Sequence, residues 1–327
     1  MSRLRLVFCG TPQFAVPSLQ KLLALPEFEI LGVFTQPDRP KGRGNELATS
    51  PVKEVATVAG IPVFQPAKIR APEIEQHLKN LAPDAIIIIA YGQIIPGKLL
   101  PIPRLGWINL HASLLPKYRG AAPIHWAIAN GETLTGNTTM RIDAGMDTGE
   151  MLLQQELQIA PDETSPELAK RLAEAGSDLI IETLRGLAAG TLQSRAQDSE
   201  QATYAPILKR EDGNIDWSKP AHEIYNRMRG FTPWPGSYTS FRGQTCHVWG
   251  APVDARDATL KNETSQNLPG TILWQAGKLV VICGAATEME LQDVKLEGRK
   301  RIPAAEFANG ARLQNGERFG DGKFAQA

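Results

Sequence analysis

Short apolar runs alternate with segments of helical periodicity along the first half of the chain. The run Ala85–Ala90 has no polar position, which is typical of a parallel strand covered on both faces. The other runs that predict strands here are Leu4–Cys9, Ile30–Thr35, Val63–Phe64 and Trp107–His111. Strands that alternate with helices in this way predict an α/β domain built on a doubly wound, mostly parallel, Rossmann-like sheet.

Helix signals lie between and after these runs. Ser50 followed by Pro51 predicts a helix start, because a Ser side chain caps the first turn and Pro fits its geometry. Gly60 is placed to end that helix. A long amphipathic helix is predicted over Pro166–Leu187. The polar stretch Gln36–Thr49, rich in Gly, Pro and Arg, predicts a loop.

The pattern changes after residue 188. Residues 188–201 have no apolar periodicity, so we expect a first domain over 1–189, a linker over 190–208 and a second domain over 209–327. The second domain has one predicted helix, Ala221–Arg229. Its β-rich runs are Tyr238–Arg242, Thr245–Val248, Thr271–Trp274, Leu279–Cys283 and Glu288–Val294. Runs with this spacing predict a small β-barrel or sandwich.

The composition is that of a globular protein. The 327 residues correspond to about two domains of ~150 residues. Lys+Arg and Asp+Glu are both 35, which excludes a strongly charged binder or a disordered tail protein. The longest apolar run, Ala85–Tyr91, is far shorter than the ~20 residues of a membrane helix. No signal peptide is recognisable at the start, and the absence of an apolar heptad pattern favours a monomer.

Several common chemical motifs are absent. The three cysteines, Cys9, Cys246 and Cys283, are widely spaced and odd in number, so we expect neither a disulfide framework nor a zinc site, and a cytoplasmic protein. Gly10-Thr-Pro-Gln follows the first strand where a dinucleotide fingerprint would lie, but no GxGxxG is found there. The P-loop pattern GxxxxGK[ST] is also missing. A dinucleotide-dependent dehydrogenase and a P-loop NTPase are therefore disfavoured.

The densest chemistry lies at the end of the strand Trp107–His111. Asn109 and His111 are two residues apart, so both side chains project from the same face of the strand. They lie near its carboxyl end, where doubly wound sheets bind ligands. An amide can stabilise an oxyanion and an imidazole can transfer a proton, which suits chemistry at a carbonyl group. A core histidine beside a turn asparagine is the alternative interpretation.

A second candidate element is the segment Gly136–Gly149. A strand of β-branched residues leads into a loop that contains Asp143 and Asp147 between glycines. An aspartate there could orient His111 and stabilise its protonated form, as in other acyl-transfer sites. A turn-forming aspartate or a calcium-like loop remains the alternative, although the ligand spacing of an EF-hand is missing.

Together the two elements resemble the folate-dependent formyltransferase superfamily. The resemblance is carried by Asn109-x-His111-x-Ser113-Leu-Leu-Pro116, followed about 30 residues later by Asp147-x-Gly149. It implies a formyltransferase fold, catalytic roles for Asn109, His111 and Asp147, and 10-formyltetrahydrofolate as formyl donor. It also implies that the folate pocket is bordered by Ser113, Leu114, Leu115, Pro116, Ala90, Tyr91, Gly92, Asp143 and Gly145.

Four further features are similar to those of the branch of this superfamily that formylates methionyl initiator tRNA. They are the start Phe8-Cys-Gly10-Thr11-Pro12, the loop Phe34–Gly44 leading to Ser50–Lys53, Arg119–Ile124, and Gly230–Gly236 in the second domain. This resemblance implies direct attack of the methionyl amine on the formyl group, no metal, and a second domain like an oligonucleotide-binding barrel. A sugar-nucleotide N-formyltransferase, a non-catalytic tRNA-binding relative and a formyltetrahydrofolate hydrolase are the alternatives.

Basic residues in two places are candidates for contact with tRNA. Arg39, Lys41 and Arg43 oppose one acid, Asp38, in the loop, and such a cationic loop suits the phosphates of an acceptor stem. In the second domain the candidates are Lys209, Arg210 and the run Arg299–Arg301. A solvated surface is the alternative in each case. The aromatic residues expected to pack in the core or turns of this domain are Trp217, Phe231 and Trp234.

Overall fold

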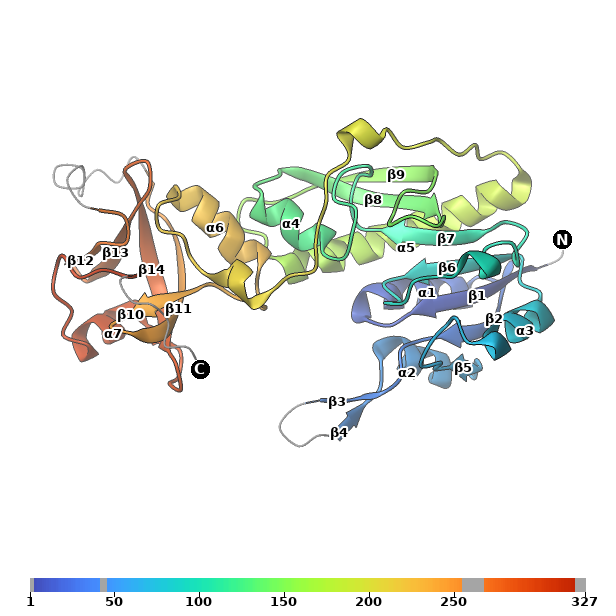
Figure 1. The fold of residues 1–327 in the computed structure, drawn as a ribbon, viewed down its shortest axis with the longest axis horizontal. Helices are drawn as coiled ribbons and strands as arrows, with labels where there is room; N and C mark the ends of the chain where they lie inside the picture. Colours follow the sequence, from blue (N-terminus) through green and yellow to red (C-terminus); the bar gives the residue numbers. More distant parts are fainter. Residues whose placement is uncertain (1–2, 42–45, 255–267, 321–327) are drawn as a thin grey trace. The chain divides into compact units, whose positions relative to one another are not determined.

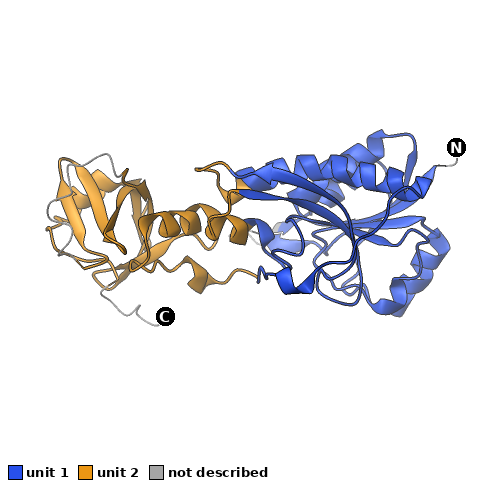
Figure 2. Ribbon diagram, turned by 90° about the horizontal axis from the view of Figure 1, so that it is seen from above, with its two compact units in different colours: residues 1–124, 134–159, 167–206 blue, residues 125–133, 160–166, 207–327 orange. Residues whose placement is uncertain are grey.

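The computed structural model describes residues 3–41, 46–254 and 268–320. The chain divides into two compact units, which are coloured differently in Figure 2. Unit 1 comprises residues 1–124, 134–159 and 167–206. Unit 2 comprises residues 125–133, 160–166 and 207–327. Two short segments from the first half of the chain thus group with the second unit, which no sequence pattern indicated.

Unit 1 contains a seven-stranded sheet in the order β5-β2-β1-β6-β7-β8-β9 (Figure 1). The strands are β1 (Leu4–Gly10), β2 (Phe28–Phe34), β5 (Val63–Phe64), β6 (Ala85–Ile89), β7 (Trp107–His111), β8 (Leu134–Arg141) and β9 (Met151–Gln158). All pairs from β5 to β7 are parallel, whereas β8 and β9 pair antiparallel. The predicted doubly wound, mostly parallel sheet is confirmed.

Helices pack on both faces of this sheet. They are α1 (Val16–Ala24), α2 (Pro51–Val58), α3 (Pro72–Leu81) and α5 (Ser165–Ala189), with 3-10 turns η1 (Gln13–Ala15), η2 (Gly97–Leu99) and η3 (Ser199–Gln201). Ile87 and Ile89 of β6 lie in a core with α1 and α5, and Ile86 and Ile88 lie in a second core with α3. Because successive side chains alternate between two buried faces, every position of β6 is apolar.

The helix α2 begins where the sequence predicts it. Ser50 Oγ accepts a hydrogen bond from the backbone N–H of Lys53 at 3.1 Å, and Pro51 occupies the first helical position. Gly60, just beyond the helix, has a φ of +70°, the left-handed conformation that commonly terminates helices. Within the described residues, no helix combines the length and the apolar character that crossing a membrane requires.

A small hairpin occupies part of the stretch Gln36–Thr49. Strands β3 (Arg39–Lys41) and β4 (Glu46–Ala48) pair antiparallel, with Arg39 opposite Ala48. The prediction of an irregular loop is wrong for these residues. Three-residue strands are too short for an alternating pattern to be recognised, and a proline inside one weakens the strand signal further.

Unit 2 is built on an antiparallel sheet in the order β10-β11-β14-β13-β12, with β15 paired to β14. The strands are β10 (Tyr238–Phe241), β11 (Gln244–Pro252), β12 (Ile272–Gln275), β13 (Lys278–Cys283), β14 (Thr287–Leu296) and β15 (Ile302–Pro303). The helical elements after residue 207 are η4 (Arg210–Gly213), α6 (Ala221–Gly230) and α7 (Ala304–Gly310), and α4 (Pro123–Ala129) begins at the end of a unit 1 segment. The expected small β domain after residue 208 is thus an antiparallel sheet packed with α6 and α7.

The three aromatic residues predicted to pack in the core or turns of this domain lie in different environments. Trp217 lies in the core of unit 2, and Phe231 is fully buried, its ring in edge contact with Trp126. Trp234 lies in a turn and is 54% exposed. Trp234 lies between Pro233 and Pro235 in the turn after α6, and this turn directs the side chain outward. Hydrophobicity alone does not reveal the direction in which a turn presents its side chains.

The two-sided burial of β6 predicts a large stability cost for truncation of one of its side chains. We expect Ile87→Ala to lower the free energy of unfolding by about 2–5 kcal/mol, because Ile87 is completely buried and its loss leaves a cavity. The matched control is Ile94→Ala, at a position that is 92% exposed, with an expected change within about 0.5 kcal/mol. Urea unfolding followed by circular dichroism measures both; equal effects would contradict this account of the core.

Candidate active site

The carboxyl end of β7 presents the two residues that the strand pattern singled out. Asn109 pairs with Ile88 of β6 and with Met140 of β8, so it lies on a strand hydrogen-bonded on both sides. His111 is the last residue of β7 and is buried. Asn109 is partly exposed, and its carboxamide makes no hydrogen bond to the residues that the structure describes. This amide is therefore available to a bound molecule.

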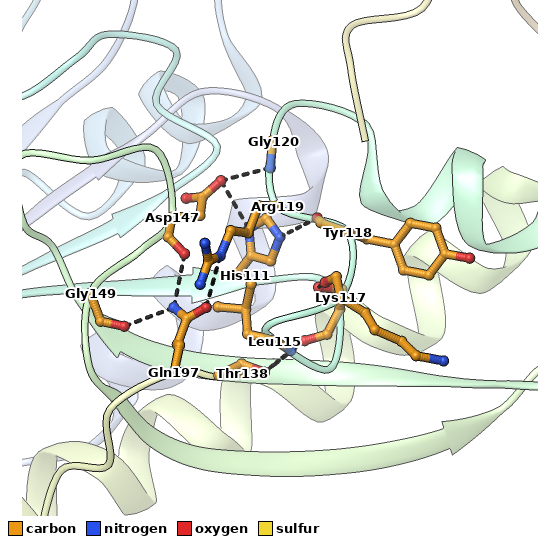
Figure 3. A network of polar contacts seen from close by, with 11 residues as sticks. His111, Leu115, Lys117, Tyr118, Arg119, Gly120, Thr138, Asp147, Gly149 and Gln197 are labelled. Carbon is orange, nitrogen blue, oxygen red and sulfur yellow. Dashed lines mark hydrogen bonds and ion pairs between the residues drawn. The ribbon is translucent and has the colours of Figure 1, made fainter. Parts of the chain in front are cut away.

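His111 is held from both sides of its ring (Figure 3). Its Nε2 lies 2.9 Å from the carbonyl oxygen of Tyr118. Because a carbonyl oxygen can only accept, Nε2 carries the proton and donates it. In the neutral ring, Nδ1 is then the unprotonated nitrogen, and it lies 3.8 Å from Asp147 Oδ2. Asp147 is thus placed to stabilise a proton that arrives at Nδ1.

Asp147 comes from the loop between β8 and β9. Its Oδ2 accepts a hydrogen bond of 2.9 Å from the backbone N–H of Gly120. Its φ is +54°, in the left-handed region that few non-glycine residues adopt. The structure therefore brings His111 and Asp147 together, with Asn109 on the same strand face as His111.

The expected folate residues lie on three loops. The Ser-Leu-Leu-Pro loop is bonded to β8, since Thr138 Oγ1 donates to Ser113 O (2.7 Å) and accepts from Leu115 N–H (3.1 Å). Leu115 is buried against Met140 and Met151. Leu114 and Pro116 remain partly exposed on this loop. Ser113 and Leu115 therefore support the loop, whereas Leu114 and Pro116 can contact a ligand.

The two other loops carry the remaining folate candidates. Ala90 and Gly92 both have positive φ directly after β6, and between them Tyr91 O accepts from Thr11 Oγ1 (3.2 Å) and Gln36 Nε2 (3.1 Å). Asp143 Oδ1 accepts from Gly145 N–H (3.0 Å) and from Thr148 Oγ1 (2.8 Å) in an exposed turn. A Cβ at Gly145 would lie 1.9 Å from Thr148 Oγ1, so a side chain there would displace the hydroxyl that binds Asp143.

The residues expected to contact tRNA have separate locations. Arg39 lies exposed on β3 of unit 1, and Lys41 ends the same strand, although its side chain falls outside the described part of the chain. Arg43 lies outside the described residues altogether. Lys209 and Arg210 are exposed at the start of η4 in unit 2.

Two residues at the site were missed by the sequence interpretation. Arg119 is 3% exposed and directs its Nε to Gln197 Oε1 at 3.0 Å. Gln197 lies in the segment expected to be a linker, and its amide donates to the carbonyl oxygens of Asp147 and Gly149, each at 2.8 Å. Arg119 occurs within a recognised motif, but nothing in the sequence around Gln197 signals such a contact.

Comparison with known proteins identifies the family of the chain. The family model for formyl transferase matches residues 4–184, and that for the formyl transferase C-terminal domain matches residues 207–312. Among solved structures, an N-formyltransferase from Helicobacter canadensis superposes with a TM-score of 0.63 at 18% identity, covering 89% of this chain and 99% of that one. HypX from Aquifex aeolicus superposes with a TM-score of 0.61 at 15% identity, covering 94% of this chain and 48% of that one. Fold and site together define a formyltransferase.

Closer relatives share nearly the whole length of the chain. A methionyl-tRNA formyltransferase from Solibacter usitatus is 52% identical over 98% of this chain and 99% of its own. The enzyme of the same name from Geobacter sulfurreducens is 48% identical over 98% of each chain. The chain belongs to the methionyl-tRNA formyltransferase family.

The close packing behind Asp147 predicts that the loop tolerates no side chain at Gly149. A Cβ there would lie 1.8 Å from Arg141 O, so Gly149→Ala must displace the loop. We expect a loss of about 1–3 kcal/mol in the free energy of unfolding, the usual cost of overpacking. The control is Gly97→Ala, where an added Cβ meets nothing within 4 Å. Urea denaturation compares the two, and a Gly149 variant as stable as the control would contradict the geometry.

Proposed function

We propose that this protein transfers the formyl group of 10-formyltetrahydrofolate to the α-amino group of methionine esterified to initiator tRNA. The observation that carries the proposal is the pair formed by His111 Nδ1 and Asp147 Oδ2 at 3.8 Å. His111 lies on the same strand as Asn109, whose amide is not engaged by the described residues. The names of the relatives at about 50% identity supply the acceptor. We expect the reaction in the cytoplasm and a monomeric enzyme.

Asn109, His111 and Asp147 each have a separate role in the transfer reaction. The neutral amine attacks the formyl carbon, and the Asn109 amide donates a hydrogen bond to the oxyanion that forms. Nδ1 of His111 accepts the proton released by the amine, and the carboxylate of Asp147 stabilises the resulting imidazolium. The bond from carbon to N10 of the folate then breaks, and His111 returns the proton to N10. The new amide and tetrahydrofolate leave, and the enzyme is unchanged.

The donor site follows from the three loops around the triad. We propose that the backbone at Ala90–Gly92, the exposed parts of Leu114 and Pro116, and the turn Asp143–Gly145 border the pterin. Ser113, Leu115 and Tyr91 then act by holding these loops, since their side chains are buried. The Helicobacter canadensis structure is a complex with folinic acid and the HypX structure a complex with tetrahydrofolic acid, which supports a folate as the ligand of a chain with this fold.

The hairpin of unit 1 supports a contact with RNA phosphates. Asp38, the acid at its base, forms an ion pair with Lys53 and accepts a hydrogen bond of 2.8 Å from Gln65. The hydrogen bonds from Lys53 and Gln65 lower the pKa of the Asp38 carboxyl. Its charge is therefore compensated locally, and the exposed Arg39 is available to phosphates of the acceptor stem. We propose the same partner for Lys41 and Arg43 from their sequence positions alone.

A face of unit 2 combines cations with aromatic rings, and we define it as the aromatic face: Arg210, Tyr238, His247, Trp249 and Arg301. Arg210 lies 6.0 Å from the Tyr238 ring and Arg301 lies 4.1 Å from the Trp249 ring. The ring of His247 lies between, 5.8 Å from Tyr238 and 6.4 Å from Trp249. Tyr238 is buried, whereas His247 and Trp249 are partly exposed. Cations beside partly exposed rings suit RNA, because they offer phosphate contacts beside stacking surfaces. We propose that Lys209, Arg210 and this face contact tRNA.

The positive charge of the aromatic face comes from its arginines at neutral pH. Burial, and then the neighbouring cations Lys295 and Arg210, lower the pKa of His247 below its ordinary value near 6.5. His247 is thus neutral at pH 7 and contributes a ring, not a charge, to any contact with RNA. Binding of tRNA through this face is expected to be insensitive to pH between 7 and 8.

The roles of the triad predict large kinetic effects with little change in stability. We expect His111→Ala and Asp147→Asn each to lower kcat about 10²- to 10⁴-fold, the usual contribution of a proton-transfer group. Asparagine tolerates the left-handed backbone and can accept the Gly120 hydrogen bond, so the second variant removes the charge alone. Formylation of charged initiator tRNA measures turnover. Asp178→Asn, at an exposed position on α5, is the control, and near-normal turnover of either triad variant would contradict the assigned role.

The aromatic face predicts a salt-dependent defect. We expect Arg210→Ala to raise the KM for methionyl-tRNA several-fold, to leave kcat unchanged, and to lower the slope of log binding affinity against log salt by about one. Filter binding of initiator tRNA at several salt concentrations provides the slope. Arg185→Ala, on α5 of unit 1, is the control. A salt slope identical to that of the unaltered protein would remove Arg210 from the interface.

A further inference from the structure

The backbone at Asp147 adopts a conformation that something else must maintain. Its φ of +54° is unfavourable for a residue with a side chain, and such residues persist where surrounding contacts determine the backbone. The loop around it is exposed, since residues 143 to 146 and Thr148 all lie open to solvent. The carboxylate of Asp147 therefore depends on specific contacts to face Nδ1 of His111.

One side chain supplies two of these contacts. Gln197 Nε2 donates to Asp147 O and to Gly149 O, both at 2.8 Å (Figure 3). The two protons of a single amide thus bind the carbonyl groups on either side of Thr148. Gln197 is fifty residues away along the chain, so this is a tertiary contact that the loop cannot make by itself.

The orientation of this amide is fixed by a buried cation. Gln197 Oε1 accepts from Arg119 Nε at 3.0 Å, and a guanidinium can only donate. If the amide were flipped, its NH₂ would face Arg119 and its oxygen would face two carbonyl oxygens. Arg119 is 3% exposed, so its guanidinium is held inside the protein beside Gln197.

Arg119 lies between Tyr118 and Gly120, the two residues whose backbone groups bind His111 and Asp147. Its backbone N–H donates to Thr203 O at 2.9 Å, and its carbonyl accepts from Ala205 N–H at 2.8 Å. Tyr118 O, the residue before, binds His111, and Gly120 N–H, the residue after, binds Asp147. The side chain of Arg119 thus connects the histidine support to the aspartate loop through Gln197.

We propose that Gln197, oriented by Arg119, is a positioning residue for catalysis: its amide protons hold the Asp147 loop so that the carboxylate faces His111 Nδ1. This inference rests on the proposed formyl transfer. Gln197 touches no reacting atom, so its effect is transmitted by the geometry of Asp147. A misplacement of about 1 Å in a catalytic group can lower a rate by ~10²-fold.

Two substitutions test whether the hydrogen bonds donated by the Gln197 side chain are needed for turnover. Gln197→Met keeps the length and removes every hydrogen bond. Gln197→Glu keeps an acceptor for Arg119 but replaces the donor by a carboxylate that repels the two carbonyl groups. We expect both to lower kcat about 10- to 100-fold per folded molecule, with the KM values for formyl donor and methionyl-tRNA within about twofold of normal. The control is Gln201→Met, an exposed glutamine on η3 whose side chain bonds only to Asp198 within the described residues.

A double-mutant cycle tests the route of the effect. If Gln197 acts through the carboxylate of Asp147, Gln197→Met must lower kcat less than about threefold in an Asp147→Asn background. The group that Gln197 positions has lost its charge in that background. An equal loss in both backgrounds, or a normal kcat for Gln197→Glu, would overturn the proposal. The unaltered chain in the same assay separates the two hypotheses. Its failure to transfer formyl contradicts the proposed function, whereas normal turnover of Gln197→Met contradicts only the role of Gln197.

Discussion

The hydrogen bond between His111 Nε2 and the carbonyl oxygen of Tyr118 decides what the site can do. Because it keeps the resting proton on Nε2, the lone pair of Nδ1 faces the carboxylate of Asp147. The opposite tautomer would lose this 2.9 Å hydrogen bond and gain only a contact at 3.8 Å. The acceptor is a backbone atom, so the tautomer is set by the course of the chain and does not depend on the side chain at position 118.

The backbone of residues 118–120 binds both His111 and Asp147. The carbonyl of Tyr118 holds the histidine, and the N–H of Gly120 holds Asp147 Oδ2. This segment is itself anchored, since Tyr118 N–H donates to Thr203 Oγ1 at 2.9 Å and Arg119 pairs with Tyr204 in an isolated bridge. His111 lies at the end of a strand within a rigid sheet, whereas everything that faces it comes from loops. A rigid strand with adjustable loops is the usual division of labour at the carboxyl edge of α/β sheets.

The sequence predicts the parts of this structure that depend on local pattern. The apolar run of β6, the Ser50 cap of α2 and the shared face of Asn109 and His111 each follow from spacing of a few residues. The contact of Gln197 with Asp147 and Gly149 follows from no spacing, because it joins segments about fifty residues apart and uses backbone carbonyls that every residue has. The exposure of Trp234 could likewise not be predicted from the spacing of hydrophobic residues, because it depends on the turn that follows α6.

The equal numbers of basic and acidic residues limit how this protein can bind a polyanion such as RNA. With 35 cations and 35 acids, no long-range field favours RNA, so affinity must come from local surfaces where acids are paired or absent. Asp38 is compensated by Lys53 at the base of the hairpin, and Asp293 of β14 is bound by Arg301 at 2.6 Å. Local compensation of this kind lets a neutral protein present short cationic surfaces, and it makes tRNA contact depend on their geometry more than on total charge.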